Sequence, residues 1–379
     1  MEFNIGADNL FIRKQVGKMK VKRPLSLVEA QERKSLVEGT VAFGVELPFP
    51  LDTLRALTSM KIFPILKTLV VLMAMLPAPI SAQLPESLMV VEAYSGKVLI
   101  ATNAGVKRPI ASLTKIATAS VAVDWATATG TDLGVMITVP QTISIVGGPN
   151  PMNLQPGDQL TLRDALYSAL LGSDNLAALT LADHVGREIS RRRGGNDDPV
   201  AIFVGEMNQL ARAVGATSTR FANPHGLDRP GAKQFSTAAD VARLSIYAMR
   251  RNPITFITSK QNRQVSVVSA GVKRNFNLTN TNDLAGEIGI LGLKTGTTAA
   301  AGPCVSVCMD RDPLVRQKPD GTKGATPRRL IVVVLNNSDR FNRARSLLRQ
   351  GWSIYDQWLA GGALIQNKDR EILTVPQPR

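Results

Sequence analysis

The sequence of 379 residues contains only two cysteines and two histidines, which leaves little material for a disulfide or a metal centre. Cys304 and Cys308 are four positions apart, so on a β-strand they would lie roughly 13 Å from each other, too far for one disulfide. His184 and His225 are distant in sequence and have no cysteine beside them, which excludes a zinc site of the usual ligand types. We therefore expect two small buried cysteines, no metal and no cofactor.

Aromatic residues are also scarce, at 5% of the chain, whereas the formal net charge is +15. The basic residues are scattered apart from the run Arg191–Arg193, which is typical of a solvated helix end. Without a stacking platform or a recognition-helix pattern, the charge does not predict a nucleic-acid partner. It favours a polyanionic surface such as a cell envelope.

Long hydrophobic runs are absent except within residues 60–82, MKIFPILKTLVVLMAMLPAPISA. A basic start, a short apolar stretch and a small-residue end predict a secretory signal peptide, and hence export to the periplasm or cell envelope. No cysteine follows the expected cleavage site, which argues against a lipoprotein. Residues 1–59 are interpreted as a spurious or disordered extension before a true start at Met60; the alternative is a cytoplasmic tail on an uncleaved signal-anchor.

Hydrophobic periodicity predicts an α+β fold in one domain, residues 83–362, followed by a short tail, 363–379. Strands near both chain ends are expected to share an antiparallel sheet flanked by helices, with a helical subdomain inserted between them. A polar, solvent-exposed loop is expected at about 310–328. The predicted strands are a hairpin at 88–102 and segments 288–296, 303–309 and 328–336; the predicted helices are 112–124, 161–171, 176–189, 200–214, 235–250 and 340–359.

Ser112 and Lys115 stand three residues apart in PIASLTKIATAS, at the start of a predicted helix. Positions i and i+3 share one helix face, so the hydroxyl and the amine could meet. A desolvated lysine can take the proton of a serine nucleophile. About one Ser-x-x-Lys is expected by chance in a chain of this length, so the pair alone is weak evidence for catalysis.

Two further motifs follow in a fixed order. Ser173-Asp174-Asn175 lies at a helix break, 61 residues after Ser112, and Lys294-Thr295-Gly296 ends a glycine-rich strand 121 residues later. Together the three motifs form the signature of serine β-lactamases and penicillin-binding proteins.

With these motifs and their flanks, the chain resembles the low-molecular-mass penicillin-binding proteins, the D-alanyl-D-alanine carboxypeptidases, over about residues 88–359. The resemblance implies the DD-peptidase/β-lactamase-like fold, peptidoglycan stem peptides as substrates and β-lactams as inhibitors. The flanking matches are SGKVL at 95–99, ASLTK at 111–115, Met207-Asn208, FANPHGLD at 221–228, STA at 236–238 and GLKTG at 292–296.

The resemblance also implies roles in acyl transfer. Ser112 would attack the carbonyl of the penultimate D-alanine, Lys115 would take its proton, Ser173 would relay a proton to the leaving amine, and Asn175 would orient Lys115 and the substrate. The backbone N–H groups of Ser112 and Thr297 would form the oxyanion hole.

Substrate binding would fall to Lys294, Thr295, Gly296 and Thr297, with the terminal carboxylate as their ligand. Arg343 matches a family arginine that assists carboxylate binding, although a surface arginine on a helix rich in them is equally consistent with the sequence. The chain ends soon after the last predicted helix, so we expect no C-terminal membrane anchor.

Three alternatives remain open at this stage. Some family members are endopeptidases that use the same motifs on cross-links. A class A β-lactamase would need a deacylating glutamate, for which Glu206 in EMNQLAR has the nearest spacing. A catalytically silent binder of wall peptides or β-lactams is the third.

Overall fold

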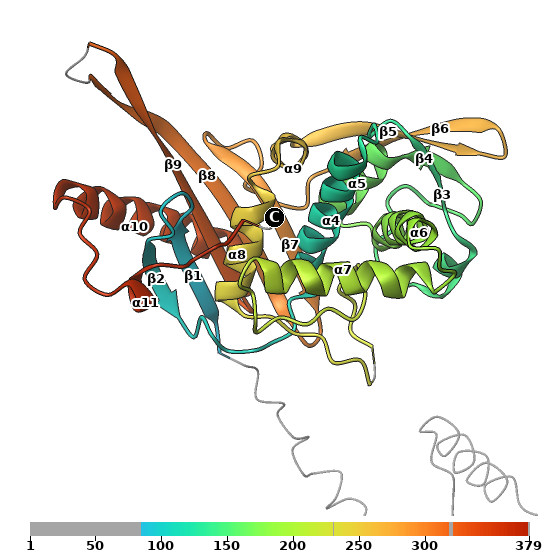
Figure 1. Cartoon of the computed structure of the whole chain (residues 1–379), viewed down its shortest axis with the longest axis horizontal. Helices are drawn as coiled ribbons and strands as arrows, with labels where there is room; N and C mark the ends of the chain where they lie inside the picture. The colour runs from blue at the N-terminus through green and yellow to red at the C-terminus, as the bar shows by residue number, and fades with distance from the viewer. Residues whose placement is uncertain (1–84, 230, 318–320, 378–379) are drawn as a thin grey trace, which may run out of the picture. The chain divides into compact units, whose positions relative to one another are not determined.

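The computed structural model describes residues 85–229, 231–317 and 321–377. The expected extension 1–59 and signal 60–82 lie outside the described residues. The unit that carries the rest of the chain is built on one antiparallel five-stranded sheet with helices on both faces (Figure 1).

The sheet joins the two ends of the described chain, as predicted. Its strand order is β2-β1-β9-β8-β7, and every neighbouring pair is antiparallel. The first two strands form the expected hairpin, and the last three come from the C-terminal third. The bounds are β1 Ser87–Glu92, β2 Val98–Thr102, β7 Ile290–Thr298, β8 Gly302–Gln317 and β9 Lys323–Leu335.

Strand β9 shows how the sheet separates two hydrophobic cores. Successive side chains of a strand point to opposite faces. Leu330, Val332 and Val334 pack with helix α10, Arg340–Ala360, while Ile331 and Val333 pack in the core of the helical region. The expected helix at 340–359 is confirmed, and Trp352, fully buried, packs against the sheet.

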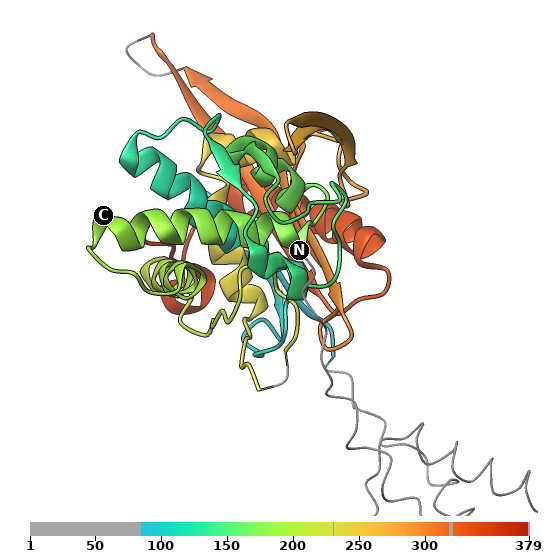
Figure 2. The ribbon, with the colours of Figure 1, turned by 90° about the vertical axis from the view of Figure 1, so that its right-hand side faces the viewer.

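Five of the helices between the strands match predicted ones, and α9 was not predicted. Thr161 accepts a hydrogen bond from the Asp164 N–H, and Thr237 accepts one from the Asp240 N–H, so each caps its helix. Figure 2 shows these helices gathered beside the sheet. They are α4 Lys115–Thr129, α5 Leu162–Leu170, α6 Asn175–Arg192, α7 Pro199–Ala213, α8 Ala238–Ala248 and α9 Asn252–Thr258.

A second, four-stranded sheet in the helical region was not predicted. Its order is β3-β4-β5-β6, and two of its strands are only three residues long. The hairpin at its edge buries only a short alternating set, Val265 and Val267 on one strand and Leu278 on the other, among mostly polar residues. The strands are β3 Met136–Thr138, β4 Gln159–Thr161, β5 Asn262–Ser269 and β6 Val272–Thr279.

The prediction of a loop at 310–328 is wrong. Strands β8 and β9 continue as a two-stranded arm through most of it, with Leu314 opposite Thr326 and Gln317 opposite Lys323. The arm extends from the sheet (Figure 1). The backbone groups pair within the hairpin, so polar side chains that face solvent on both sides do not interrupt the strands.

The segment after α10 packs back on the domain. Leu373 is buried, its backbone N–H donates to the carbonyl of Gly96, and Ile372 forms a β-bridge with Lys97. A short helix, α11 Lys368–Glu371, precedes these contacts.

Candidate active site

The Ser112 hydroxyl and the Lys115 amine are in direct contact, with Nζ 3.0 Å from Oγ. The predicted α-helix from residue 112 begins instead as a 3₁₀ turn, η1 Ala111–Thr114, and α4 starts at Lys115. In a 3₁₀ turn the side chains at i and i+3 eclipse each other, which brings the two groups closer than an α-helix would.

Lys115 is fully buried and has two further partners. Its Nζ donates to Asn175 Oδ1 at 2.7 Å and to the His225 carbonyl at 3.0 Å. Burial lowers the pKa of Lys115 to about 7, and the negative charge of Asp174 opposes this shift. Both carbonyl oxygens can only accept, so a neutral amine directs its two protons to them and its lone pair to the Ser112 hydroxyl.

Asn175 is held rigidly at the start of α6. Its backbone N–H donates to the Pro149 carbonyl at 2.9 Å, and its side-chain Nδ2 donates to the Gly147 carbonyl at 2.8 Å. Asp174 caps the helix by accepting from two backbone N–H groups through Oδ1, and its Oδ2 accepts from the Ser168 hydroxyl. Ser173 has a left-handed backbone, φ 59°, and its hydroxyl makes no hydrogen bond within the described chain.

The glycine-rich strand β7 lies against η1 and completes the site. A Cβ at Gly296 would stand 2.8 Å from the Ser112 nitrogen, closer than packing allows, so the glycine permits this approach. Thr295 Oγ1 hydrogen-bonds Thr281 Oγ1 at 2.7 Å. The three motifs therefore converge, and Thr281 is a neighbour of the site that the sequence did not reveal.

Lys294 is also buried, but no hydrogen-bond partner for its Nζ lies within the described residues. Its pKa is lowered well below the ordinary value, first by burial and then by the positive charges of Lys115 and Arg340. A buried amine that lacks an acceptor, beside two other cations, is suited to an anionic ligand.

The arginine that reaches this strand is Arg340, not the predicted Arg343. Arg340 Nη1 donates to Thr297 Oγ1 at 2.9 Å and to the Gly296 carbonyl at 3.0 Å. Arg343, one turn further along α10, is bound to the carboxylate of Glu86, with both shortest contacts at 3.1 Å. Residues three apart share a helix face, so the sequence alone could not separate the two.

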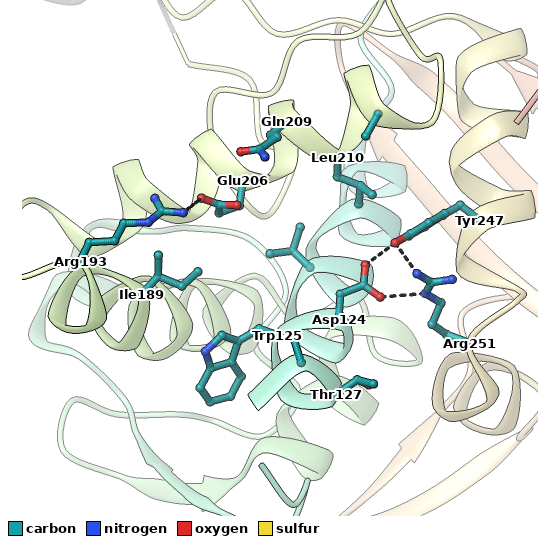
Figure 3. A pocket seen from close by; sticks show the side chains of 13 residues that line it. Asp124, Trp125, Thr127, Ile189, Arg193, Glu206, Gln209, Leu210, Tyr247 and Arg251 are labelled. Carbon is teal, nitrogen blue, oxygen red and sulfur yellow. Dashed lines mark hydrogen bonds and ion pairs between the residues drawn. The ribbon is translucent and has the colours of Figure 1, made fainter. Parts of the chain in front are cut away.

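The glutamate expected of a class A β-lactamase lies in another place. Glu206 forms an ion pair with Arg193 at 2.7 Å and lines a cavity of about 520 Å³ between α4, α6 and α7 (Figure 3). Across that cavity Asp124 accepts hydrogen bonds from Tyr247 and Arg251. None of the three motifs lines this cavity, so Glu206 is not a partner of Ser112.

The remaining expectations concern groups outside the motifs. His184 packs edge-on against Trp125, and Cys304 and Cys308 are buried and free. The His225 side chain accepts from the Leu227 N–H and so helps to hold its own loop. Within the described residues, no three His, Cys, Asp or Glu side chains cluster as metal ligands.

Apart from Thr281 and Arg340, the site residues that sequence reasoning missed act through their backbones. The carbonyls of His225, Gly147 and Pro149 orient Lys115 and Asn175. A backbone acceptor leaves no side-chain signature; the only available signals were the turn residues Gly147–Pro149 and the match around His225.

Solved structures share this fold. The chain aligns with the Streptomyces K15 DD-transpeptidase at a TM-score of 0.59 and 24% identity, over 73% of this chain and all of the other. It aligns with the D-alanyl-D-alanine carboxypeptidase DacD of Francisella tularensis at 0.57 and 24% identity, over 72% of this chain and 71% of the other.

Curated relatives and a family model identify the group. The chain is 33% identical over 270 residues to the D-alanyl-D-alanine carboxypeptidase DacC of Escherichia coli K12, covering 69% of this chain and 60% of the relative. It is 30% identical over 221 residues to the D-alanyl-D-alanine endopeptidase of the same organism, covering 58% and 65%. The chain thus spans between half and two thirds of such relatives. The model described as D-alanyl-D-alanine carboxypeptidase, peptidase S11, matches residues 75–314, and the chain belongs to that family.

Proposed function

We propose that the protein is a serine-type D-alanyl-D-alanine carboxypeptidase that removes the terminal D-alanine from peptidoglycan stem pentapeptides. One observation carries this proposal: the buried Lys115 amine contacts the Ser112 hydroxyl at 3.0 Å, while two carbonyl oxygens occupy its remaining directions. This is the arrangement of a serine with its general base. The family and the relatives named DacC and DacD agree with it.

The reaction follows from these contacts. Ser112 Oγ attacks the carbonyl carbon of the penultimate D-alanine as its proton passes to the Lys115 amine. The tetrahedral oxyanion is stabilised by the backbone N–H groups of Ser112 and Thr297. The C–N bond breaks as the leaving amine gains a proton through Ser173, and water then hydrolyses the ester on Ser112.

Recognition of the substrate depends on its terminal carboxylate. Lys294 supplies a buried positive charge. Arg340 adds a second one, held against β7 by its hydrogen bonds to the Thr297 hydroxyl and the Gly296 carbonyl. A carboxylate in this place provides the acceptor that Lys294 Nζ lacks and offsets the repulsion among the cations. β-Lactams carry a comparable carboxylate beside a reactive carbonyl, so they acylate Ser112 as inhibitors.

The decisive experiment is incubation of residues 83–379 with a stem pentapeptide and measurement of released D-alanine. Wild type is expected to release one D-alanine per peptide and to be labelled by a fluorescent penicillin, whereas Ser112→Ala does neither. A wild-type protein that binds penicillin without releasing D-alanine would contradict the proposal and support a silent binder. Fast release of hydrolysed penicillin would instead support a β-lactamase.

Endopeptidase activity on cross-links is the second candidate. Two relatives named D-alanyl-D-alanine endopeptidase, from Escherichia coli and Pseudomonas aeruginosa, are 30% and 32% identical to the chain. The catalytic contacts are common to both reactions. Cleavage of a cross-linked peptide dimer, compared with D-alanine release from a pentapeptide by kcat/KM, decides between them.

We further propose that the enzyme works outside the cytoplasm, in the periplasm or cell envelope, because 60–82 has the pattern of a secretory signal. Across the part of the chain that the structure describes, no helix combines the length and apolar character needed to span a bilayer. Fractionation of cells that express the full chain tests the location.

A further inference from the structure

A second cavity, of about 510 Å³, lies among α5, α9 and the first residues of β5, elements that Figure 1 shows side by side. Its volume is in the range of small-molecule sites, and none of the three catalytic motifs lines it. One wall is apolar and consists of Leu133, before β3, with Pro253, Phe256 and Ile257 of α9. Phe256 is 58% exposed, so this wall presents apolar surface that no described residue covers.

Two arginines line the same cavity. Arg263, on β5, is exposed and makes no hydrogen bond or ion pair within the described residues. Arg163, on α5, has one ion pair in the described chain, with Asp132 at 3.9 Å, and the two side chains are 49% and 83% exposed. An exposed pair at that distance contributes little free energy. Both guanidinium groups are therefore available to an anion, and no acidic residue lines the cavity.

Tyr167, also in the lining, shows that positive charge gathers in this place. Burial raises the pKa of its phenol, the charges of Arg263 and Arg163 oppose this shift, and Asp164 acts more weakly in the other direction. Both guanidinium groups therefore lie near the phenol, and the Arg263 guanidinium carbon is 5.0 Å from the centre of its ring. The Tyr167 hydroxyl has no hydrogen-bond partner among the described residues. Two cations and a donor are thus placed together, and the described chain supplies no acceptor for the donor.

These features define the chemistry of a ligand. The apolar wall favours an aliphatic chain, because removing apolar area from water is favourable. The two arginines favour a carboxylate or a phosphate, whose oxygens match the guanidinium fork. Lys260, whose Nζ lies 4.3 Å from the centre of the Phe256 ring, adds positive charge at the edge of the wall. A neutral chain would leave the arginines unpaired, and a small anion would leave the wall uncovered.

We propose that this cavity binds an amphipathic anion, an aliphatic chain that ends in a carboxylate or a phosphate. The chain packs against α9 and Leu133, and the head group pairs with Arg263 and Arg163. Fatty acids and phosphate-headed lipids are the two sources of this chemistry. The inference does not depend on the proposed carboxypeptidase function, because no residue of acyl transfer takes part in it.

Isothermal titration calorimetry with residues 83–379 tests this inference. These residues fall within the compact unit Ala82–Arg379 and omit the apolar run in 60–82, whose own affinity for lipid would obscure the result. The probes are octanoate, octyl phosphate, octanol and acetate, each below its micellar concentration. Octanoate and octyl phosphate are expected to bind about tenfold more tightly than octanol, which has no anionic head for charge-assisted hydrogen bonds. Acetate, which lacks the chain, should bind about tenfold more weakly than octanoate.

Substitutions of two exposed residues separate the head group from the chain. Arg263→Gln should weaken both octyl anions about tenfold and leave octanol unchanged. Phe256→Ala should weaken octanoate and octanol by the same factor, about three- to tenfold, because it removes apolar contact alone. Arg212→Gln, an exposed arginine on α7 outside the cavity, is the matched control and should bind every probe as wild type does. Circular dichroism confirms the fold of each variant.

The relative affinities of the probes decide the outcome. Tighter binding of octanoate identifies a carboxylate-headed ligand and tighter binding of octyl phosphate a phosphate-headed one, and either result supports the inference. It is overturned if neither anion binds, if octanol binds as tightly as the anions, or if Arg263→Gln leaves the anion affinities unchanged. Acetate that matches octanoate also overturns it, because the apolar wall then contributes nothing. None of these measurements uses D-alanine release, so failure of the proposed function would leave the test intact.

Discussion

The two buried lysines of the site stand in opposite surroundings. On the helix side, Lys115 directs its amine at three oxygen atoms, those of Ser112, Asn175 and His225. On the strand side, Lys294 has no hydrogen-bond partner within the described residues, and the positive charges of Lys115 and Arg340 lower its pKa further after burial. The amine of Lys115 thus has a full set of hydrogen-bond partners, whereas the amine of Lys294 has none within the described residues.

This difference assigns the two amines different tasks. A lysine whose neighbours fix both of its protons keeps a lone pair aimed at one hydroxyl, which suits proton transfer. A lysine without an acceptor costs free energy in the empty site, and the cost is relieved when an anion enters. Lys115 is therefore expected to set the rate of acylation, and Lys294 the affinity for the carboxylate.

Lys115→Met gives the largest expected effect. Methionine fills a similar volume but removes the base, so the rate of acylation by penicillin should fall by about 10²–10⁴. Stopped-flow or gel-based labelling of Ser112 measures the rate, and circular dichroism confirms the fold. An acylation rate within a few-fold of wild type would show that another group takes the proton.

Lys294→Met is expected to act on binding and stability in opposite directions. Loss of the positive charge should raise KM for the pentapeptide by about 10–10², because an ion pair with the carboxylate disappears. The unfolding free energy should rise by about 1–3 kcal/mol, because an unsatisfied buried amine is replaced by an apolar group. Denaturant unfolding of the ligand-free protein checks the second effect, and a destabilised variant would mean that Lys294 is not a strained group.

The pH dependence of kcat/KM and of the unfolding free energy tests the lowered pKa of Lys115. Acylation needs neutral Lys115, whose pKa is lowered to about 7, so kcat/KM should rise about tenfold per pH unit below 7 and level off above it. In the unfolded chain the same amine titrates near 10.4, so between pH 7 and about 10 the unfolded state binds one more proton. The unfolding free energy should therefore increase with pH in this window, by up to about 1.4 kcal/mol per unit.

The difference between wild type and Lys115→Met isolates this contribution, because other titrating groups are common to both. The variant should lack that part of the slope. A wild-type kcat/KM that keeps rising about tenfold per pH unit above pH 8 would imply that the Lys115 amine keeps an ordinary pKa.

Local patterns predicted most of the fold but not its polar extensions. The terminal strands and the helices capped by Thr161 and Thr237 were predicted because their apolar periodicity and caps are written in adjacent residues. The arm of β8 and β9 was missed because pairing between backbones, rather than burial of alternate side chains, holds it. The hairpin of β5 and β6 was missed although Val265, Val267 and Leu278 are buried, because polar residues surround this short apolar set. The same limit hid the backbone carbonyls around Lys115.

At the site, sequence order identified the three motifs, but it did not fix the arginine. Motif residues are read from their immediate neighbours, whereas the choice between Arg340 and Arg343 depends on how α10 lies against β7. That orientation is set by packing between segments distant in sequence. If α10 were shifted by about one turn along its axis, Arg343 would take the place of Arg340 beside β7.

The smallest expected effects come from this matched pair. Arg340→Gln should raise KM for the pentapeptide by roughly tenfold, because its guanidinium anchors Thr297 and adds positive charge beside Lys294. Arg343→Gln should leave KM unchanged and lower the unfolding free energy by less than about 1 kcal/mol, since it removes only a partly exposed ion pair with Glu86. Steady-state kinetics of the two variants beside wild type give the answer. If Arg343→Gln raised KM and Arg340→Gln did not, the anion beside β7 would be bound by the arginine one turn further along α10 and not by the one that contacts Thr297 in the structure.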